Sequence, residues 1–273
     1  MIGLTRDDAH VYTAHYPPAE PVTLTSITTA LKALDKPAIA PWARRVTAEA
    51  AVRNLPTLVE MLKMGSEADT IKFLTSLADN RRDAKADVGT RVHALCEALV
   101  NGHEVSIAED EAPYMAAFDA FRNDYRPRWT AVEYMVANLT VGYAGTGDDV
   151  AWLPCPVHNK ECRYRFDKKT MGINDKGQPK GPYRETGLQL AAAEYAEFCG
   201  RPDDPKQYAV PQAEHCAVLA LLENGKYVFV PYAVTRRTFD AFVNTLRAWE
   251  WLNGEAKSII GQPLTSALLR EAA

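Results

Sequence analysis

The chain has 273 residues, of which 47% are hydrophobic and 24% charged, proportions ordinary for a soluble globular protein, and it has no internal repeats or low-complexity tracts. Its net charge of −4 argues against a nonspecific polyanion binder, and no apolar run approaches the length of a membrane span. The first ten residues lack the basic and apolar regions of a signal peptide and the five cysteines form no regular framework, so we expect reduced thiols in a cytoplasmic protein.

The first half of the chain is predicted to be mainly helical. Residues 1–21 are polar and contain a Pro-Pro pair, which indicates a loosely held arm. Ser26 or Thr25 can cap a helix that starts at Ile27. Apolar residues at three-to-four spacing predict further helices at 41–79, 87–100 and 111–124.

The second half has the composition of a β-sheet. β-Branched and aromatic residues separated by Gly and Pro predict strands at 129–137, 141–153 and 162–170. An Ala-rich helix at 184–199, a hairpin at 216–233 with its turn at Asn224-Gly225, and an amphipathic helix at 235–252 follow. This order predicts an α/β or α+β fold, with a central mixed β-sheet flanked by helices. We expect one domain over 22–273, with a helical part at 22–125 and a sheet core at 129–252.

The charge is distributed unevenly along the chain. Residues 160–184 hold eight basic and three acidic side chains, so this window is +5 and the remainder is −9. A basic patch on an acidic body can bind phosphates. A solvated loop and strand edge is the alternative interpretation.

Asp167 and Lys169 lie two apart on a predicted strand, so their side chains share one face. Such a pair is most often a surface ion pair of little energetic value. A second acid can join it from the preceding strand, where Asp148 and Asp149 point to opposite faces and only one can take part. The alternative is that GTGDD (145–149) is a hairpin turn.

His93 flanks the apolar stripe of the predicted helix 87–100, and Glu97 lies one turn further on the same side. A lone helical histidine is more often a packed or capping residue than a ligand. This one is polar on a helix whose stripe packs on the sheet, so we expect it to face the strands.

Four short motifs occur in a fixed order along the chain. They are GTxxH (Gly89, Thr90, His93), GxxD (Gly145, Asp148), DxKT (Asp167, Lys169, Thr170) and LQLA (Gln189). Over about residues 22–252 the chain thereby resembles the RecB-like branch of the PD-(D/E)xK nuclease superfamily, and is similar to phage-encoded recombination exonucleases. The resemblance implies a restriction-endonuclease-like core with a helical N-terminal elaboration. It also implies a metal-dependent DNA nuclease, an exonuclease on linear DNA in phage recombination or replication, in the cytoplasm of the bacterial host.

The resemblance also implies roles for individual residues. His93, Asp148, Asp167 and the backbone carbonyl of Lys168 are expected to bind Mg²⁺ or Mn²⁺, ions that suit such donors. Lys169 is expected to stabilise negative charge developing on the phosphate, and Gln189 to place Lys169 or contact the DNA backbone. Asp148 and Asp167 count among the catalytic residues as well.

The sequence departs from the family pattern at two places. The family usually has a tyrosine four residues after the glutamine, where this chain has Ala193, and Tyr195 faces elsewhere on a helix. Some relatives bind an iron–sulfur cluster, for which Cys199 and Cys216 are too few and too far apart, so we expect none.

Several other residues are weaker candidates. Glu97 is a candidate for an outer shell of the metal site, and Glu133 for the outer shell or for a second metal, although a glutamate facing water is the more common case for Glu133. Cys155, His158 and Cys162 are spaced loosely like zinc ligands, but with only three in view we expect a hairpin loop with incidental thiols rather than zinc.

DNA is the expected partner, with no membrane partner. The basic window is expected to contact duplex DNA through Arg163, Arg165, Lys168, Lys176, Lys180 and Arg184, with Arg122, Arg126 and Arg128 as helpers. A phage single-strand annealing protein and further copies of the chain are candidate protein partners, by family analogy. Two alternatives stay open: an inactive DNA-binding or scaffold protein of the same fold, and a sequence-specific endonuclease.

Overall fold

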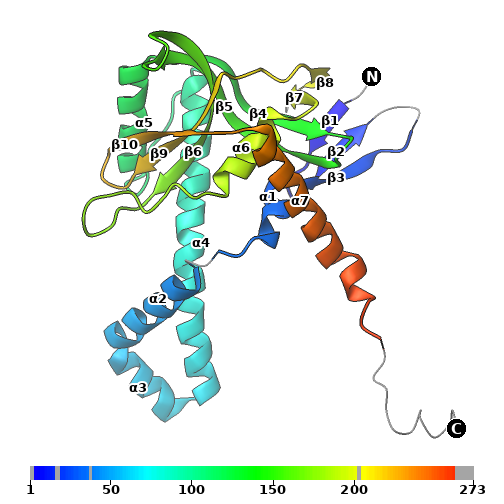
Figure 1. Cartoon of the computed structure of the whole chain (residues 1–273). Helices are drawn as coiled ribbons and strands as arrows, with labels where there is room; N and C mark the ends of the chain where they lie inside the picture. Colours follow the sequence, from blue (N-terminus) through cyan, green and yellow to red (C-terminus); the bar gives the residue numbers. More distant parts are fainter. Residues whose placement is uncertain (1–2, 16–18, 37–38, 202–203, 262–273) are drawn as a thin grey trace, which may run out of the picture.

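The computed structural model describes residues 3–15, 19–36, 39–201 and 204–261. Its centre is a mixed β-sheet with helices on both faces, and a helical arm projects from it (Figure 1). No helix in these residues combines the length and apolar character needed to cross a membrane.

The N-terminal residues belong to the sheet rather than to a loose arm. β1 (Gly3–Arg6), β2 (Tyr12–His15) and β3 (Val22–Ser26) pair antiparallel, and β3 joins β5 in parallel. The predicted arm at 1–21 is therefore wrong where it is described; residues 1–2 and 16–18 of it lie outside the described residues. β1 and β2 have four residues each and β3 has five, so they contain too few alternating positions to predict strands from the sequence.

Ser26 caps the following helix, as predicted, with its hydroxyl accepting from the Thr29 N–H at 3.1 Å. This helix is short, since α1 (Ile27–Ala30) passes into a single 3₁₀ turn, η1 (Leu31–Ala33).

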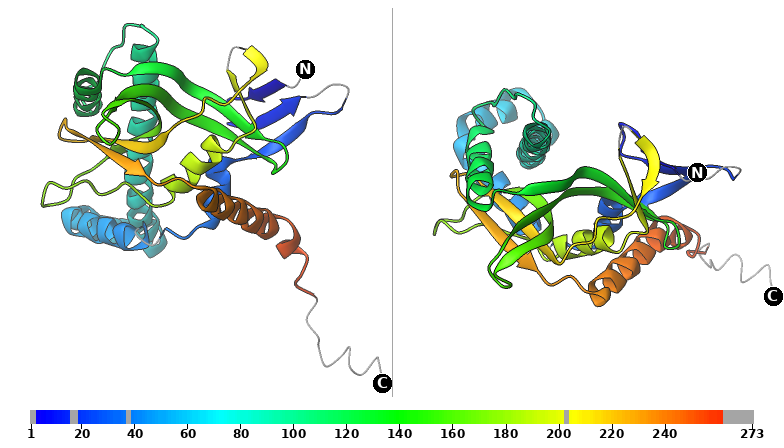
Figure 2. Two further views of the ribbon diagram at one scale, coloured as in Figure 1. Left: turned by 45° about the horizontal axis from the view of Figure 1, so that its top comes forward. Right: turned by 90° about the horizontal axis from the view of Figure 1, so that it is seen from above.

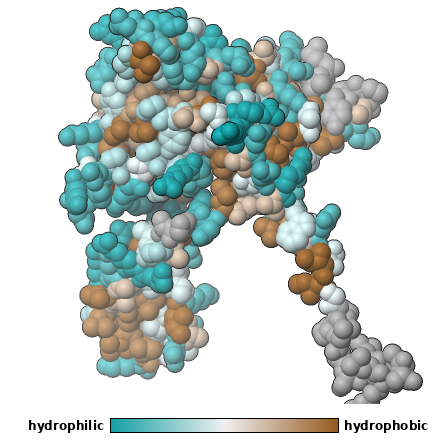
Figure 3. All heavy atoms as spheres, in the orientation of Figure 1, coloured by the Kyte–Doolittle hydropathy of each residue, from teal (hydrophilic) through white to brown (hydrophobic). Residues whose placement is uncertain are grey.

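The predicted helix 41–79 is three helices. α2 (Ile39–Arg53) ends before Asn54, α3 (Leu55–Met64) ends before Gly65, and α4 (Glu67–Val100) is capped by Ser66. α4 also includes the predicted helix 87–100, because residues 80–86 contain neither Gly nor Pro to stop it. α2, α3 and the first half of α4 form the arm. Its exposed apolar residues include Val52, Leu55, Leu62, Met64 and Ile71. Figure 3 shows apolar surface on the arm.

The sheet core follows the prediction closely. β4 (Arg128–Asn138), β5 (Tyr143–Cys155) and β6 (Lys160–Met171) form an antiparallel meander, and β6 pairs in parallel with β9 (His215–Leu222). β9 and β10 (Tyr227–Tyr232) form the predicted hairpin, whose turn contains Gly225 at φ +79°. The mixed sheet with flanking helices is thereby confirmed.

Helices cover both faces of this core (Figure 2). α5 (Ala112–Tyr125) and the end of α4 pack on one face around Phe118, Phe121 and Phe166. α6 (Thr186–Glu194) and α7 (Arg236–Asn253) pack on the other around Phe239 and Phe242. Thr235 caps α7 in a reciprocal capping box with Thr238.

The predicted helix 184–199 is too long. α6 ends at Glu194, and the chain continues as β7 (Phe198–Arg201), which pairs with β4, and β8 (Asp204–Tyr208), which pairs with β7. A last 3₁₀ turn, η2 (Glu255–Lys257), follows α7.

Candidate metal and catalytic site

The candidate site lies where two neighbouring strands separate. The β5–β6 ladder runs from Cys155↔Lys160 to Asp149↔Phe166 and continues no further. Asp148 is the first residue of β5 beyond it. Its carboxylate Oδ2 accepts a hydrogen bond from the Lys168 N–H at 2.6 Å, so a side chain replaces the next rung between the strands.

Alternation along the strands places Asp148, rather than Asp149, with Asp167. Asp148 and Asp167 line a small cavity together with Gln189 of α6. Asp149 points to the opposite face and pairs there with the Lys168 ammonium. β5 is continuous from Tyr143 to Cys155, so the interpretation of GTGDD as a turn is wrong.

The glycines beside these acids are explained by packing. A Cβ on Gly145 would lie 2.4 Å from Ile27 Cδ1, and one on Gly147 would lie 2.6 Å from the Tyr134 ring. Gly89 plays a similar part on α4, where an added Cβ would lie 3.1 Å from Thr170 Oγ1. These glycines let α1 and α4 approach the sheet closely, which brings His93 to the strands.

Three potential ligands converge at the separation of the strands. His93 Nδ1 lies 3.5 Å from Asp148 Oδ2 and 3.7 Å from Glu133 Oε1, and one ligand atom from each residue lies within 4.8 Å of the others. The interpretation of Glu133 as a glutamate facing water is wrong, since its side chain is only 19% exposed. Glu97, one turn after His93 on α4, is half-buried and is not a member of this group.

The backbone at Glu133 is unusual for a strand. Its φ is +44°, in the left-handed region that non-glycine residues rarely adopt, and it sits between the ladder pairs Val132↔Asp149 and Tyr134↔Gly147. Such conformations cost about 1–3 kcal/mol and concentrate at functional sites. No pattern in the sequence predicts this left-handed conformation. The sequence therefore did not predict that the Glu133 side chain lies beside His93 and Asp148.

Asp167 and Lys169 form the predicted pair beside this group. Lys169 Nζ donates to Asp167 Oδ1 at 2.8 Å, and the carboxylate side chain is only 4% exposed. Asp167 is not among the three converging ligands. The Lys168 N–H bonds to the Asp148 carboxylate, and the Lys168 carbonyl remains a predicted ligand.

Burial and neighbouring charges shift the pKa values of these groups. Burial raises the pKa of Asp167 to about 6, against the opposing effect of Lys169. For Asp148 the same burial is outweighed by His93, Lys168 and Lys169, which hold its pKa below the usual range. Burial would lower the pKa of His93, but Asp148 and Glu133 raise it. The pKa of Lys169 is raised by Asp167 and Asp148 despite its burial. Neighbouring opposite charges therefore favour the charged forms of Asp148, His93 and Lys169, whereas burial favours the neutral form of Asp167.

Two of the predicted DNA-binding residues are buried and cannot contact DNA. Lys168 is 1% exposed because its ammonium pairs with Asp149. Arg165 is 1% exposed, since its guanidinium bonds to Glu194 (2.7 Å), the Pro211 carbonyl (2.8 Å) and the Tyr134 hydroxyl. Both assignments are corrected: a strand that is covered on each face leaves its basic residues inside.

The remaining basic residues fall into two groups. Lys176, Lys180 and Arg184 are exposed in the loop between β6 and α6, close in sequence to Asp167 and Lys169. Arg163 is half-buried, lies over the Trp152 ring at 4.8 Å and donates to the Gln212 carbonyl. The helpers Arg122 and Arg128 form ion pairs with Asp119 and Glu161, and Arg126 is exposed at the end of α5.

Ala193 and Tyr195, the residues considered at the position of the expected tyrosine, lie in different surroundings. Ala193 lines the small cavity beside Asp148 and Asp167. Tyr195 stacks on Phe239 with ring centroids 5.1 Å apart, so it belongs to the core and not to the site.

No family model matches the chain, and no curated protein is significantly similar to it.

Proposed function

We propose that the protein is a divalent-metal-dependent DNA nuclease with a restriction-endonuclease-like core. The observation that carries the proposal is the convergence of His93, Glu133 and Asp148 beside the Asp167–Lys169 pair, at the point where β5 and β6 separate. The antiparallel β4–β5–β6 meander and the parallel pairing of β6 with β9 support the core assignment.

The three converging residues fit a hard divalent cation. Two carboxylates and an imidazole suit Mg²⁺ or Mn²⁺, and the imidazole shifts preference toward Mn²⁺. Within the described chain no hydrogen bond reaches the buried Oε1 of Glu133, which has His93 Nδ1 and Lys168 Nζ each at 3.7 Å. A buried carboxylate oxygen without a hydrogen bond is costly unless it binds a cation. When bound, the ion would supply Lewis-acid polarisation of the phosphate and lower the pKa of a water molecule.

The other residues of the site would position and stabilise the reacting phosphate. Lys169, held by Asp167, carries a positive charge beside Asp167 and Asp148, where it would stabilise negative charge developing on the phosphate oxygens. Gln189 lines the same cavity from α6 and could donate its amide to a phosphate oxygen or to the Asp167 carboxylate.

Exposed basic residues close in sequence to Asp167 and Lys169 would bind the DNA backbone. Lys176, Lys180 and Arg184 lie in the loop that directly follows the strand carrying Asp167 and Lys169. Phosphate contacts of this kind position a duplex without reading its sequence. By resemblance, the substrate is linear DNA digested from an end during phage recombination or replication. A single-strand annealing protein and self-association remain candidates for partners.

The test is incubation of purified protein with end-labelled linear and circular duplexes in the presence of Mg²⁺ or Mn²⁺. We expect degradation of the linear DNA that stops on chelation. The variants Asp148→Asn and Lys169→Met should each abolish cleavage. Asp240→Asn and Lys226→Met, at exposed positions in α7 and in the β9–β10 turn, are the matched controls and should retain it.

Measurement of Mn²⁺ binding distinguishes a variant that cannot bind the metal ion from one that binds it but cannot cleave DNA. Asp148→Asn should lose Mn²⁺ binding, measured by titration calorimetry, whereas Lys169→Met should keep it and lose only cleavage. Digestion of linear DNA by Asp148→Asn at the unaltered rate would refute the assignment of this site. DNA binding without cleavage under any metal would favour the inactive scaffold instead.

A further inference from the structure

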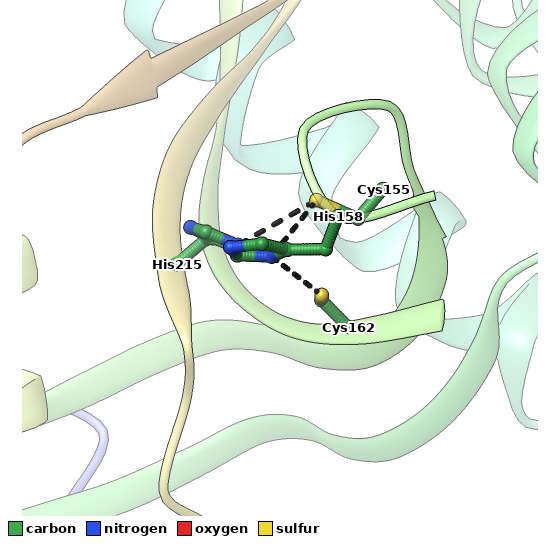
Figure 4. A group of neighbouring side chains, drawn as sticks. All are labelled: Cys155, His158, Cys162 and His215. Carbon is green, nitrogen blue, oxygen red and sulfur yellow. Dashed lines mark hydrogen bonds between the residues drawn. The ribbon is translucent and has the colours of Figure 1, made fainter. Parts of the chain in front are cut away.

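A second cluster of metal-binding side chains lies at the far end of the same strands (Figure 4). Cys155 is the last residue of β5, His158 lies in the turn that follows, and Cys162 lies near the start of β6. The fourth member, His215, is the first residue of β9. The sequence shows three of these residues together, but α6, β7 and β8 separate the fourth from them.

The sheet register explains why the four side chains meet. Cys155 pairs with Lys160 and Leu153 pairs with Cys162, so strand alternation directs both thiols to the same face. β9 runs parallel to β6 and brings His215 opposite Tyr164, two residues from Cys162. The turn then folds the His158 imidazole over the thiols, and its ring stacks on that of His215 with centroids 5.0 Å apart.

Four distances between the ligand atoms lie within about 0.3 Å of the edges of a tetrahedron around zinc. With Zn–S of about 2.3 Å and Zn–N of about 2.0–2.1 Å, tetrahedral geometry requires S···N edges of about 3.5 Å and N···N edges of about 3.3 Å. The Cys155 sulfur lies 3.6 Å from His158 Nδ1 and 3.6 Å from His215 Nε2. His158 Nδ1 lies 3.2 Å from the Cys162 sulfur and 3.2 Å from His215 Nε2.

We infer that Cys155, His158, Cys162 and His215 form a structural Zn²⁺ site. Two thiolates and two imidazoles are a ligand set that selects zinc, and four protein ligands leave no open position for a substrate. The Tyr164 hydroxyl donates to the Cys155 sulfur at 3.1 Å, which is the outer-shell hydrogen bond that such thiolates usually receive. The sequence favoured a loop without zinc because His215, the fourth ligand, is distant from the other three along the chain.

This site is distinct from the proposed nuclease site. Cys162 and Asp167 are five residues apart on β6, which corresponds to about 17 Å along a strand. Zinc would join the ends of β5, β6 and β9, and two of these strands also carry Asp148, Asp167 and Lys169. The inference therefore holds or fails independently of the nuclease proposal.

The first test measures zinc in protein purified without chelator from zinc-supplemented medium. Elemental analysis should find about one zinc ion per chain, as a closed four-ligand site requires. Cys162→Ser and His215→Ala should lose the ion, whereas the matched controls Cys199→Ser and His103→Ala should retain it. Asp148→Asn should also retain it, which distinguishes this ion from any bound at the nuclease site.

The second test uses the unaltered chain, so it does not depend on a variant that folds. After removal of the native metal, added Co²⁺ should produce the d–d absorption of a tetrahedral site together with a thiolate-to-cobalt charge-transfer band, and subsequent addition of Zn²⁺ should abolish both. An unaltered chain that contains no zinc and gives no such cobalt spectrum would overturn the inference and leave a cluster linked by hydrogen bonds alone. Retention of zinc by soluble Cys162→Ser and His215→Ala would overturn it as well.

Discussion

Removing the buried charge of Lys168 should destabilise the fold rather than weaken DNA binding. The ammonium is 1% exposed and pairs with Asp149, which is fully buried. It also lies 3.7 Å from Glu133 Oε1. In Lys168→Met the methionine side chain fills about the volume of the lysine methylene groups. The carboxylates of Asp149 and Glu133 lose the positive charge beside them.

The size of the effect follows from the burial of the pair. Breaking a buried pair by removing one partner costs about 3–5 kcal/mol, because the other charge is left uncompensated. For a chain of this size, about 1 kcal/mol corresponds to about 2–4 °C in melting temperature, so the loss should reach about 10 °C. The double variant Lys168→Met/Asp149→Leu should recover much of the loss, because it leaves no charge unpaired at that position.

The loss of stability in Lys168→Met should also depend on pH. Burial raises the pKa of Asp149 to about 7, above its unfolded value, even with Lys168 present. Without Lys168 the folded state holds the proton of Asp149 more firmly than the unfolded state does. Stability is then present at acid pH and is lost as pH rises toward the folded pKa, so the deficit of Lys168→Met should be larger near about pH 8 than near about pH 5.

Urea unfolding followed by circular dichroism measures this loss, with zinc retained and no Mg²⁺ or Mn²⁺ added. Lys176→Met is the control, because this lysine is exposed in the β6–α6 loop and its replacement should change stability by less than about 0.5 kcal/mol. A Lys168→Met protein as stable as this control, with weakened DNA binding, would refute the reasoning.

Three further predictions concern the site and its surroundings. Glu133→Gln should lower Mn²⁺ affinity at least about tenfold in titration calorimetry, because the site loses a charged ligand; unchanged affinity would exclude Glu133. Joint replacement of Lys176, Lys180 and Arg184 by Gln should lower the slope of log K for DNA against log salt by about 3, and an unchanged slope would place the DNA elsewhere. Gly145→Ala should cost about 1–3 kcal/mol in urea unfolding, because its Cβ would overlap Ile27; a neutral result would contradict that close packing.

The sequence was sufficient for elements whose signals are local. The strands around Asp148 and Asp167, the β9–β10 turn at Asn224-Gly225 and the cap at Ser26 all follow from alternation, turn chemistry or capping within a few residues. The same local rules placed Asp167 beside Lys169, since residues two apart on any strand share a face.

Tertiary structure decided everything that depends on pairing between distant segments. The sheet register selected Asp148 over Asp149 and placed Lys168 inside, and no property of the β6 sequence distinguishes a covered strand from an exposed edge. The backbone twist at Glu133 turned its carboxylate toward His93.

The cluster of Cys155, His158, Cys162 and His215 shows most clearly the difference between local sequence signals and the pairing of distant segments. The sequence alone shows three potential ligands close together, Cys155, His158 and Cys162. Three ligands were not sufficient to predict a zinc site. The parallel pairing of β9 with β6 supplies His215. Local chemistry follows from residue spacing along the chain, whereas a complete ligand set depends on which strands become neighbours, and that is determined by the packing of the whole sheet.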